Sequence, residues 1–493
     1  MEILDQLRDI LGERYLNTGK DAEPWTKDWT NYYHWQPLAV VRPSNTAQVQ
    51  AIVRACSASD VAMVPVGGNT GLAGGTKAQD SIMISLDRMN AIREIKSSSQ
   101  VAVVESGAIL EKIHQAVDEY DLVFPLLFGA RGSAMIGGNL STNAGGSNVL
   151  RYGNTRDLCL GIEVVLADGR VMNLMSELRK DNTGLNLKDI FIGAEGTLGI
   201  ITAAVLRLYR KPLAYVTAMV GLRTLTDSLP LLSHLQNETS GGVEAFEFMP
   251  RRYIERHLEK KKGSSEPFDE PHEVNILLEV ATTRASDLEQ DDNGTPKLRS
   301  IVETALMDMI ENGSAQDAVI AQNETQRRAM WERREAAAEI TFGIPGSIDT
   351  DIAVPLDNVP IFLEQVSDRV KEIDPNGEEF YIAHLGDGNL HYTFYPSDTS
   401  GNLKEPITEA IEDVVIGLNG SFSAEHGIGL SKKGSMARRK DPVALENMYI
   451  YEMFNDKFKI PTKKKLEMIK FYIMALPKMS EIEKVDIDPS KIK

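Results

Sequence analysis

The stretch PVGGNTGLAGGT, residues 65–76, is unusually rich in glycine, and a second glycine-rich stretch, GARGSAMIGGNLSTNAGGSNVLRYGN, covers residues 129–154. Glycine accepts positive φ and lets backbone amides approach a ligand without an intervening Cβ, so that consecutive amides can cradle an anion. The spacing matches neither the dinucleotide fingerprint G-x-G-x-x-G nor a P-loop. Two loops used only for tight connections are the alternative. Two such stretches in one region favour a large nucleotide cofactor held from two sides.

The sequence around these stretches predicts an α/β arrangement followed by a second domain. Upstream, PLAVVRPSNTAQVQAIVRACSASDVAMVPVGG alternates short apolar strands with a capped helix. Longer helical patterns interrupted by polar loops follow residue 212. We therefore divide the chain into an N-terminal helical segment (1–32), a cofactor-binding domain (33–212), a substrate domain (213–450) and an atypical tail rich in Lys and Met (451–493).

Composition excludes several classes of function. The chain has 493 residues, 42% of them hydrophobic, and a formal net charge of −18, which disfavours nucleic acid and anionic membranes as partners. No apolar run approaches the length of a transmembrane helix, and the first residues do not resemble a secretory signal. Cys56 and Cys159 are the only cysteines, so a disulfide scaffold is excluded. These features predict a cytoplasmic protein.

The octapeptide HLGDGNLH, residues 384–391, places two histidines around a turn. Asp387-Gly388 is a strong signal for a two-residue hairpin turn, in which His384 faces His391. Directly opposed residues have Cβ atoms about 4.5–5.5 Å apart, close enough for two imidazoles to bind one divalent metal ion. A hairpin with two ordinary histidines is the alternative.

Six motifs in order resemble one family. PVGGNTGLAGG, GARGSAMIGGNLSTNAGG, RYGN, GAEGTLGIIT, HLGDGNLH and SAEHGIG are similar to the successive motifs of the flavin-linked 2-hydroxy-acid dehydrogenases, over about residues 35–447. That group includes D-lactate and D-2-hydroxyglutarate dehydrogenases and the flavin subunit of glycolate oxidase, within the vanillyl-alcohol-oxidase superfamily. The resemblance implies an α+β fold: a two-lobed PCMH-type FAD-binding domain followed by a ferredoxin-like α+β cap with C-terminal helices.

The resemblance also implies the cofactor site. Neither glycine-rich stretch contains a His or Cys that could bond the flavin, so non-covalent FAD is expected. The implied FAD-binding residues are Pro65, Gly67, Gly68, Asn69, Thr70, Gly71, Leu72, Gly129, Ser133, Gly137, Gly138, Asn143, Gly145 and Gly146 at the pyrophosphate, and Glu195, Gly196, Gly199 and Ile200 on the adenosine and isoalloxazine side.

The family motifs further imply a metal site, with His384, His391 and Glu425 as ligands. Two imidazoles and a carboxylate suit zinc, with Mn or Co as alternatives. His426 is the candidate base, because an imidazole can accept a proton at neutral pH. Arg334, favoured over its neighbour in WERRE, is the candidate for orienting the substrate carboxylate.

The expected activity is oxidation of a D-2-hydroxy acid to the 2-oxo acid, with hydride transfer to flavin N5. Expected partners are the small acid and an electron acceptor, which could be an electron-transfer flavoprotein, a quinone or a cytochrome, and a homodimer is allowed. Two alternatives remain: a flavin subunit of a multi-subunit glycolate oxidase, and a flavin-binding protein without turnover.

The sequence departs from its relatives in two places. Enzymes acting on D-2-hydroxyglutarate typically carry a Thr four residues after the substrate Arg and a Lys shortly before a D-[LIV]-[SA]-[LV]-P motif, and here these positions hold Ala338 and Asp349. This predicts a preference for acids without a free distal carboxylate. The Lys-rich tail also replaces the usual C-terminal segment of the family, which leaves the contacts made there open.

Overall fold

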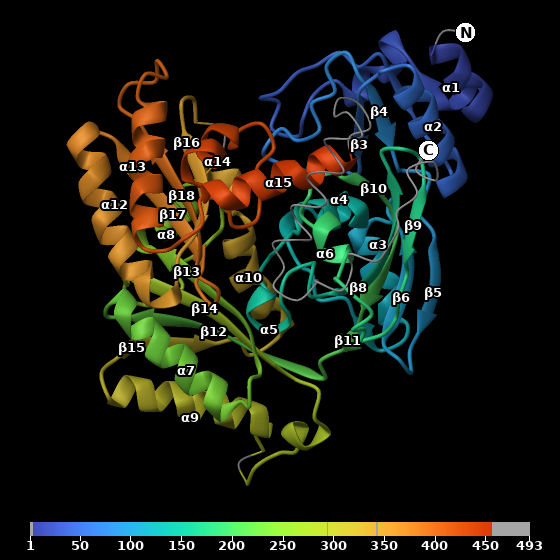
Figure 1. The fold of residues 1–493 in the computed structure, drawn as a ribbon. Helices are drawn as coiled ribbons and strands as arrows, with labels where there is room; N and C mark the ends of the chain where they lie inside the picture. Colours follow the sequence, from blue (N-terminus) through green and yellow to red (C-terminus); the bar gives the residue numbers. More distant parts are fainter. Residues whose placement is uncertain (1–2, 293, 342–343, 456–493) are drawn as a thin grey trace, which may run out of the picture.

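The structure is a computed structural model that describes residues 3–292, 294–341 and 344–455. The strands of the described chain form four sheets, and the molecule divides around them into two parts (Figure 1). The N-terminal part holds three sheets between Leu16 and Arg210, and the C-terminal part holds one sheet between Ala214 and Tyr395. This is the mixed helix and sheet arrangement that the sequence predicts.

The first sheet has the strand order β1-β2-β4-β3, in which the last three strands are parallel. Parallel strands need a crossover connection, and α2 (Thr46–Ala58) supplies the one from β2 to β3. Its N-cap Asn45 accepts a hydrogen bond from the Gln48 amide. The strands are β1 (Leu16–Asn17), β2 (Ala39–Val41), β3 (Met63–Val66) and β4 (Ile82–Ser85), and α1 (Ile3–Leu11) packs on α2. The first glycine-rich stretch thus begins within β3 and continues past its carboxyl end.

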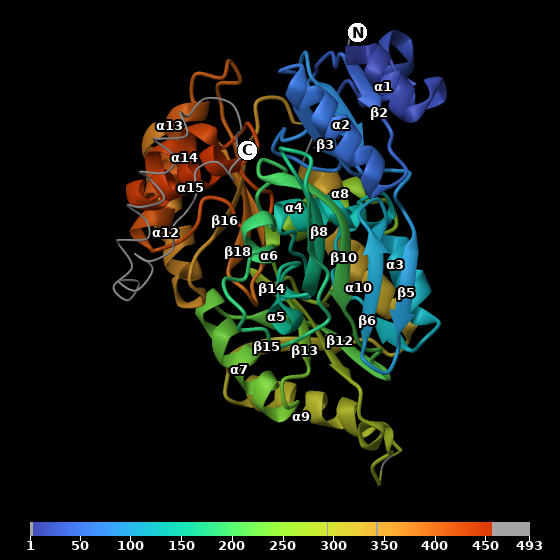
Figure 2. The same cartoon turned by 45° about the vertical axis from the view of Figure 1, so that its right-hand side comes forward.

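The second sheet is antiparallel, with the order β5-β6-β10-β8-β9. Its strands are β5 (Ile92–Lys96), β6 (Val101–Glu105), β8 (Cys159–Leu166), β9 (Val171–Leu174) and β10 (Gly199–Arg207). The helices α3 (Leu110–Asp118) and α4 (Ile136–Thr142) share its apolar core, and α4 lies between this sheet and the C-terminal part (Figures 1 and 2). A small third sheet pairs β7 (Leu122–Val123) with β11 (Tyr209–Arg210). The short helices α5 (Val149–Tyr152) and α6 (Lys188–Phe191) complete this part.

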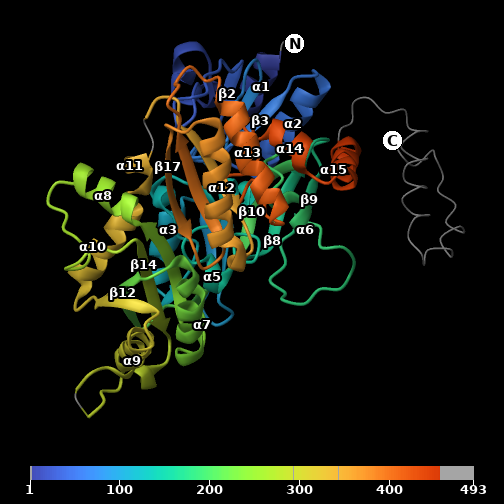
Figure 3. The ribbon, with the colours of Figure 1, turned by 90° about the vertical axis from the view of Figure 1, so that its left-hand side faces the viewer.

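The C-terminal part is built on a seven-stranded antiparallel sheet with the order β15-β12-β14-β13-β17-β18-β16. Its strands are β12 (Ala214–Leu222), β13 (Val243–Pro250), β14 (Val274–Thr282), β15 (Ala315–Ile320), β16 (Ile348–Ala353), β17 (Glu378–His384) and β18 (Asn389–Tyr395). The helices α7 (Ser228–Glu238), α9 (Lys297–Glu311), α12 (Val359–Ile373) and α13 (Lys404–Gly417) cover one face and form with it the largest apolar core. In Figure 3, α12 and α13 lie on the outer side of this sheet.

The opposite face of this sheet carries α8 (Arg251–Lys260), α10 (Glu324–Glu335) and α11 (Ala337–Thr341), which pack on a second, smaller core. Side chains alternate between the two faces of a strand, so residues whose neighbours enter the large core must point to this face. On this basis Glu247 of β13, His384 of β17, His391 of β18 and Asp351 of β16 share one face. The polar residues of four strands are thereby gathered in one place.

The predicted pairing of His384 with His391 across a two-residue turn is wrong. In the structure His384 pairs with Asn389, and His391 pairs with Ile382, because four residues (385–388) separate β17 from β18. A register shift of one residue would have moved one histidine to the other face, but a shift of two preserves the face. The imidazoles therefore still meet, with ring centroids 5.3 Å apart.

The chain continues through α14 (Lys433–Arg439) and α15 (Pro442–Asn455). Most of the predicted tail lies outside the described residues. The same holds for the segment 457–478, whose sequence KFKIPTKKKLEMIKFYIMALPK is typical of a basic amphipathic helix. Within the described ranges, no helix combines the length and the apolar character needed to cross a membrane.

Candidate active site

The two glycine-rich stretches meet in the structure. A Cβ built on Gly68 would lie 2.1 Å from the Ser133 carbonyl oxygen, and one built on Gly67 would lie 3.6 Å from the Gly138 nitrogen. The first position therefore admits only glycine, since real Cβ atoms do not come so close. A Cβ at Gly71, Gly129 or Gly138 would meet no protein atom within 4 Å, so the stretches also leave space beside their backbones. This arrangement fits a nucleotide cofactor whose phosphates approach bare backbone.

Three other predicted cofactor residues hold a left-handed backbone although they are not glycine. Asn69, Asn143 and Glu195 have φ of 53°, 51° and 50°. The Asn143 side chain accepts the Arg156 amide at 2.9 Å, and the Asn69 side-chain amide donates to the Lys27 carbonyl at 2.8 Å. Such residues are uncommon in this region, and these hydrogen bonds to residues distant in the sequence help to hold Asn69 and Asn143 there.

The remaining predicted cofactor residues lie in the two glycine-rich stretches, just before β10 or at its start. Pro65 is in β3, and Gly199 and Ile200 begin β10. Gly146 has φ of 153° and Gly196 has φ of 81°. The others lie in the loops or in α4: Thr70, Leu72, Gly137 and Gly145. A Cβ on Gly145 would lie 2.6 Å from Glu425 Oε1, so the second glycine-rich stretch directly contacts a predicted metal ligand of the C-terminal part.

Four titratable side chains in the C-terminal part form a group that could hold a metal ion. Asp351, His391, Glu425 and His426 each offer a ligand atom, and these atoms lie within 4.8 Å of one another. The rings of His391 and His426 are stacked with centroids 5.8 Å apart. Two imidazoles with two carboxylates form a donor set that suits zinc or another transition metal. The structure thus brings together two of the three predicted ligands and the predicted base.

Asp351 is the member of this group that the sequence did not predict. Its Oδ2 accepts the amides of Glu425 at 2.8 Å and His426 at 2.9 Å, and its Oδ1 accepts the side-chain amide of Asn389 at 2.8 Å. Asp351 is 1% exposed, and Lys432 lies 3.7 Å from its Oδ2. Burial raises the pKa of the Asp351 carboxyl, but the charges of His426 and Lys432 outweigh burial and hold it well below its usual range. Asp351 therefore remains ionised and fixes the loop that carries Glu425 and His426.

His384, the third predicted ligand, lies beside this group and is held by Glu247. Its Nδ1 is 2.9 Å from Glu247 Oε1, and the Arg334 Nε donates to the other oxygen of the same carboxylate at 2.7 Å. Burial lowers the pKa of His384, but the Glu247 carboxylate outweighs burial and raises it to about 9. Without a metal, His384 is accordingly an imidazolium in a buried ion pair.

The other titratable groups of the cluster respond mainly to burial. Burial and the neighbouring His384 hold the pKa of His391 well below its usual value, and burial likewise lowers the pKa of His426. Burial raises the pKa of Glu425 to about 7. At neutral pH the site therefore offers neutral imidazoles at His391 and His426, which can bind a metal or accept a proton.

Comparisons with known proteins agree with the fold and with an FAD-linked enzyme. A family model described as "FAD binding domain" matches residues 37–175, and one described as "FAD linked oxidases, C-terminal domain" matches residues 211–449. D-2-hydroxyglutarate dehydrogenase of Stutzerimonas stutzeri is 33% identical over 457 residues, which cover 90% of this chain and 94% of the relative. The chain belongs to the FAD-linked D-2-hydroxy-acid dehydrogenase family.

Two further matches extend the picture. A putative mitochondrial D-lactate dehydrogenase of Schizosaccharomyces pombe is 34% identical over 426 residues, covering 84% of this chain and 78% of the relative. The crystal structure of p-cresol methylhydroxylase with bound substrate superposes with a TM-score of 0.68 at 15% identity, covering 92% of this chain and 94% of that chain. The predicted family, the PCMH-type fold and the FAD-linked oxidoreductase class are thereby confirmed.

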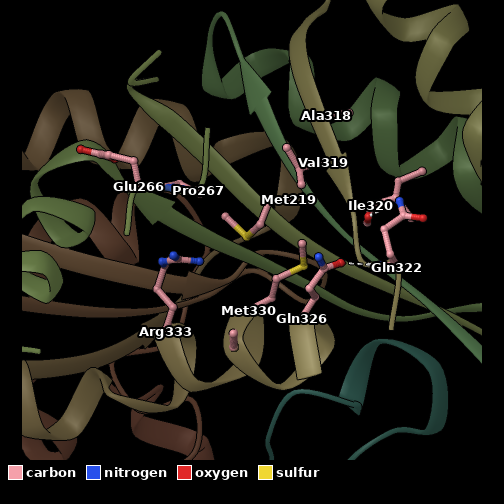
Figure 4. Close-up of a pocket in the computed structure, with 11 residues that line it drawn as sticks. Met219, Glu266, Pro267, Ala318, Val319, Ile320, Gln322, Gln326, Met330 and Arg333 are labelled. Atoms are coloured by element: carbon pink, nitrogen blue, oxygen red, sulfur yellow. Dashed lines mark hydrogen bonds between the residues drawn. The ribbon is translucent and has the colours of Figure 1, made fainter. Parts of the chain in front are cut away.

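In this FAD-linked enzyme the two adjacent arginines of α10 face different surroundings. Arg334 faces Glu247 and His384, whereas the Arg333 Nη2 donates to the Ser265 carbonyl at 2.9 Å. Arg333 lines a separate cavity of about 470 Å³ together with Met219 and Met330, between α10 and strands β12 and β15 (Figure 4). The arginine selected from the sequence is thus the one that lies beside the histidines.

Replacing Arg334 with methionine should destabilise the protein strongly. Glu247 is fully buried, and a buried carboxylate that loses one of its two cationic partners costs about 3–5 kcal/mol. Chemical denaturation should show this loss, and Glu247→Gln in the same chain should restore part of it. Arg328→Met is the matched control on the same helix, because Arg328 is 72% exposed and pairs only at the surface with Glu324. Equal stability of Arg334→Met and Arg328→Met would contradict the buried ion pair.

The two positions where the sequence departs from D-2-hydroxyglutarate enzymes can also be located. Ala338 is an exposed residue of α11. Asp349 lies two residues before Asp351 on β16 and therefore points to the same face of the sheet. Its carboxylate accepts hydrogen bonds from Thr393 Oγ1 at 2.8 Å and Ser347 Oγ at 2.9 Å. The face that carries the metal-ligand group thus carries an acid where a lysine is expected.

Proposed function

We propose that this chain oxidises a D-2-hydroxy acid to the corresponding 2-oxo acid, with FAD as the hydride acceptor and a divalent metal at the substrate site. The observation that carries the proposal is the group of neutral imidazoles and carboxylates that the C-terminal part places against the second glycine-rich stretch at Gly145. A substrate bound to that group would be adjacent to the glycine-rich stretches that we propose bind FAD. The natural electron acceptor and the cytoplasmic location remain predictions from the sequence.

His384, His391 and Glu425 are the proposed ligands of the metal, with zinc as the expected ion. Bound FAD supplies an acceptor for the C2 hydrogen at flavin N5, and a bound divalent ion supplies Lewis acidity toward the substrate hydroxyl. Because His384 is paired with Glu247 as an imidazolium, metal binding at this histidine requires release of its proton.

His426 is the proposed base that takes the proton of the substrate hydroxyl. Burial lowers the pKa of His426, so its imidazole is neutral and can accept a proton at neutral pH. The Asp351 carboxylate holds the His426 amide at 2.9 Å and lies 3.7 Å from its Nδ1, which places a negative charge beside the imidazolium that forms. In serine proteases, too, a buried aspartate orients the catalytic histidine and stabilises its imidazolium form.

Arg334 is the proposed partner of the substrate carboxylate. Its Nε donates to Glu247 and its Nη2 lies 3.3 Å from His384 Nε2, which fixes the plane of the guanidinium, and we assign the N–H groups of Nη1 to the substrate. Fixing the carboxylate would orient C2 with respect to the flavin. In this proposal Arg334 has two functions: its Nε pairs with the buried Glu247 carboxylate, and its Nη1 N–H groups bind the substrate carboxylate.

Among D-2-hydroxy acids, we expect a preference for those without a free distal carboxylate. Asp349 lies on the same face as the metal-ligand group, where its side chain is exposed, and the juxtaposition of like charges can cost several kcal/mol. With one artificial acceptor, kcat/KM for D-lactate or a longer neutral D-2-hydroxy acid should exceed that for D-2-hydroxyglutarate. Asp349→Lys should shift the ratio toward D-2-hydroxyglutarate. A clear lead of wild type for D-2-hydroxyglutarate would contradict the assigned role of Asp349, without affecting the proposed reaction.

A further inference from the structure

The loop that carries Glu425 and His426 is held by two carboxylates from opposite parts of the molecule. Asp351 of the C-terminal part accepts the amides of Glu425 and His426. Glu195 of the N-terminal part accepts the amides of Ile428 at 3.1 Å and Gly429 at 3.0 Å. Four backbone donors of one short segment are thus divided between the part that binds the cofactor and the part that carries the metal-ligand group.

The N-terminal part makes further contacts with the same segment. The Ala73 carbonyl, within the first glycine-rich stretch, accepts the Leu430 amide at 2.7 Å and the Ser431 amide at 3.2 Å. A Cβ built on Gly429, which has φ of 48°, would lie 2.2 Å from that carbonyl oxygen. A Cβ built on Gly427, which has φ of 73°, would lie 2.6 Å from Glu195 Oε1. Both glycines are therefore required for the segment to approach the N-terminal part this closely.

Glu195 is itself held in an unfavourable backbone conformation. Its φ is 50°, and its amide donates to the Ser141 carbonyl at 2.8 Å, which ties it to the end of α4. The following residue, Gly196, has φ of 81° and packs against Pro65 of β3. A left-handed non-glycine residue costs free energy and persists where its surroundings require it. Here that conformation directs the carboxylate out of the N-terminal part and onto the loop of the C-terminal part.

We propose that Glu195 is a positioning residue that docks the segment 425–431 on the N-terminal part and so sets the place of Glu425 and His426 relative to the flavin. The family resemblance implies that Glu195 lines the cofactor site. In the docked structure its carboxylate is engaged by Ile428 and Gly429. The catalytic consequence of this docking rests on the proposed function, whereas the docking itself does not.

Hydrogen–deuterium exchange of the FAD-bound, metal-free protein tests the docking without turnover. In Glu195→Ala, peptides that cover 425–431 should exchange at least about 10-fold faster than in wild type, because amide hydrogen bonds to a charged acceptor are lost. Glu195→Gln keeps one acceptor oxygen and should give an intermediate rate. Flavin absorbance should show that both variants retain FAD. Glu335→Gln is the matched control, because it removes a different contact between the two parts, the 3.3 Å pair with Arg131.

The kinetic readout follows from the same variants. Flavin reduction by substrate should slow by about 10²-fold in Glu195→Ala, the effect expected when catalytic groups shift by about 1 Å, while dithionite reduces the flavin normally. Unchanged exchange at 425–431 in both Glu195 variants would overturn the proposal. Loss of FAD from the folded variants would also overturn it, since Glu195 would then be a cofactor ligand. If the wild-type protein showed no turnover, the proposed function would be wrong. The exchange rates at 425–431 would still show whether Glu195 docks this segment.

Discussion

Replacing His426 with alanine should slow flavin reduction by a D-2-hydroxy acid by about 10²–10⁴-fold, the cost of removing one positioned acid–base group. His426 is the neutral imidazole that Asp351 holds by its amide, and its ring stacks on that of His391. Stopped-flow measurement of the flavin absorbance under anaerobic conditions gives this rate directly. Reduction by dithionite should be unaffected, because it needs no base.

The control for this variant must separate base from ligand, because His426 also lies within the candidate metal group. His426→Ala should therefore retain its metal, as measured by elemental analysis, and should retain FAD. His234→Ala is the matched histidine control, since His234 lies on α7 and pairs with Asp308 at 3.5 Å outside the cluster. A His426→Ala rate within about threefold of wild type corresponds to less than about 1 kcal/mol of barrier and would remove His426 from the proton transfer.

Removing the metal should have an effect of similar size. Treatment with a chelator should abolish flavin reduction by substrate, and Zn²⁺ or Mn²⁺ should restore it. His391→Ala should weaken metal binding by more than about 100-fold, because the variant loses a metal ligand rather than a residue that hydrogen-bonds to a ligand. FAD should remain bound, because the glycine-rich stretches lie in the N-terminal part. Full activity of a verified metal-free preparation would contradict the metal site.

The pH dependence of metal affinity distinguishes the two possible ligand sets. If His384 is a ligand, its proton must leave, and its pKa of about 9 makes the affinity rise about tenfold per pH unit between pH 7 and 8.5. If Asp351 and His426 replace it, the highest relevant pKa is that of Glu425 at about 7, so that the affinity should level off above neutral pH. A flat profile, together with metal retained in His384→Ala, would favour the second set and would exclude His426 as a free base.

The features of this molecule that depend on a few neighbouring residues could be predicted from the sequence. The start of α2 is an example, because its N-cap Asn45 accepts the amide of Gln48, only three residues further along the chain. The sequence predicts that His384 and His391 share one face of the hairpin, which the structure confirms, although the predicted register is wrong. The Asp-Gly pair predicts a two-residue turn, whereas four residues connect β17 and β18. The two histidines still share a face because the pairing register differs from the predicted one by two residues, an even number.

The residues that the sequence did not predict act across long distances in the chain. Asp351 and Glu247 come from β16 and β13, which local patterns cannot place beside β17 and β18. A signal for Glu247 was nevertheless present, because an acid within the apolar strand VEAFEFMP must be paired if it is buried. For Asp351, the signal was its alternation with Asp349 on one strand, which predicts two acids on one face.

The central claim is that a D-2-hydroxy acid reduces the flavin of this protein, and the absorbance spectrum tests it most directly. The purified, metal-loaded protein should show flavin bands that bleach when D-lactate is added anaerobically, and L-lactate should leave them unchanged. Flavin bands that persist with D-lactate, with longer neutral D-2-hydroxy acids and with D-2-hydroxyglutarate, in a protein whose flavin dithionite still reduces, would contradict the account.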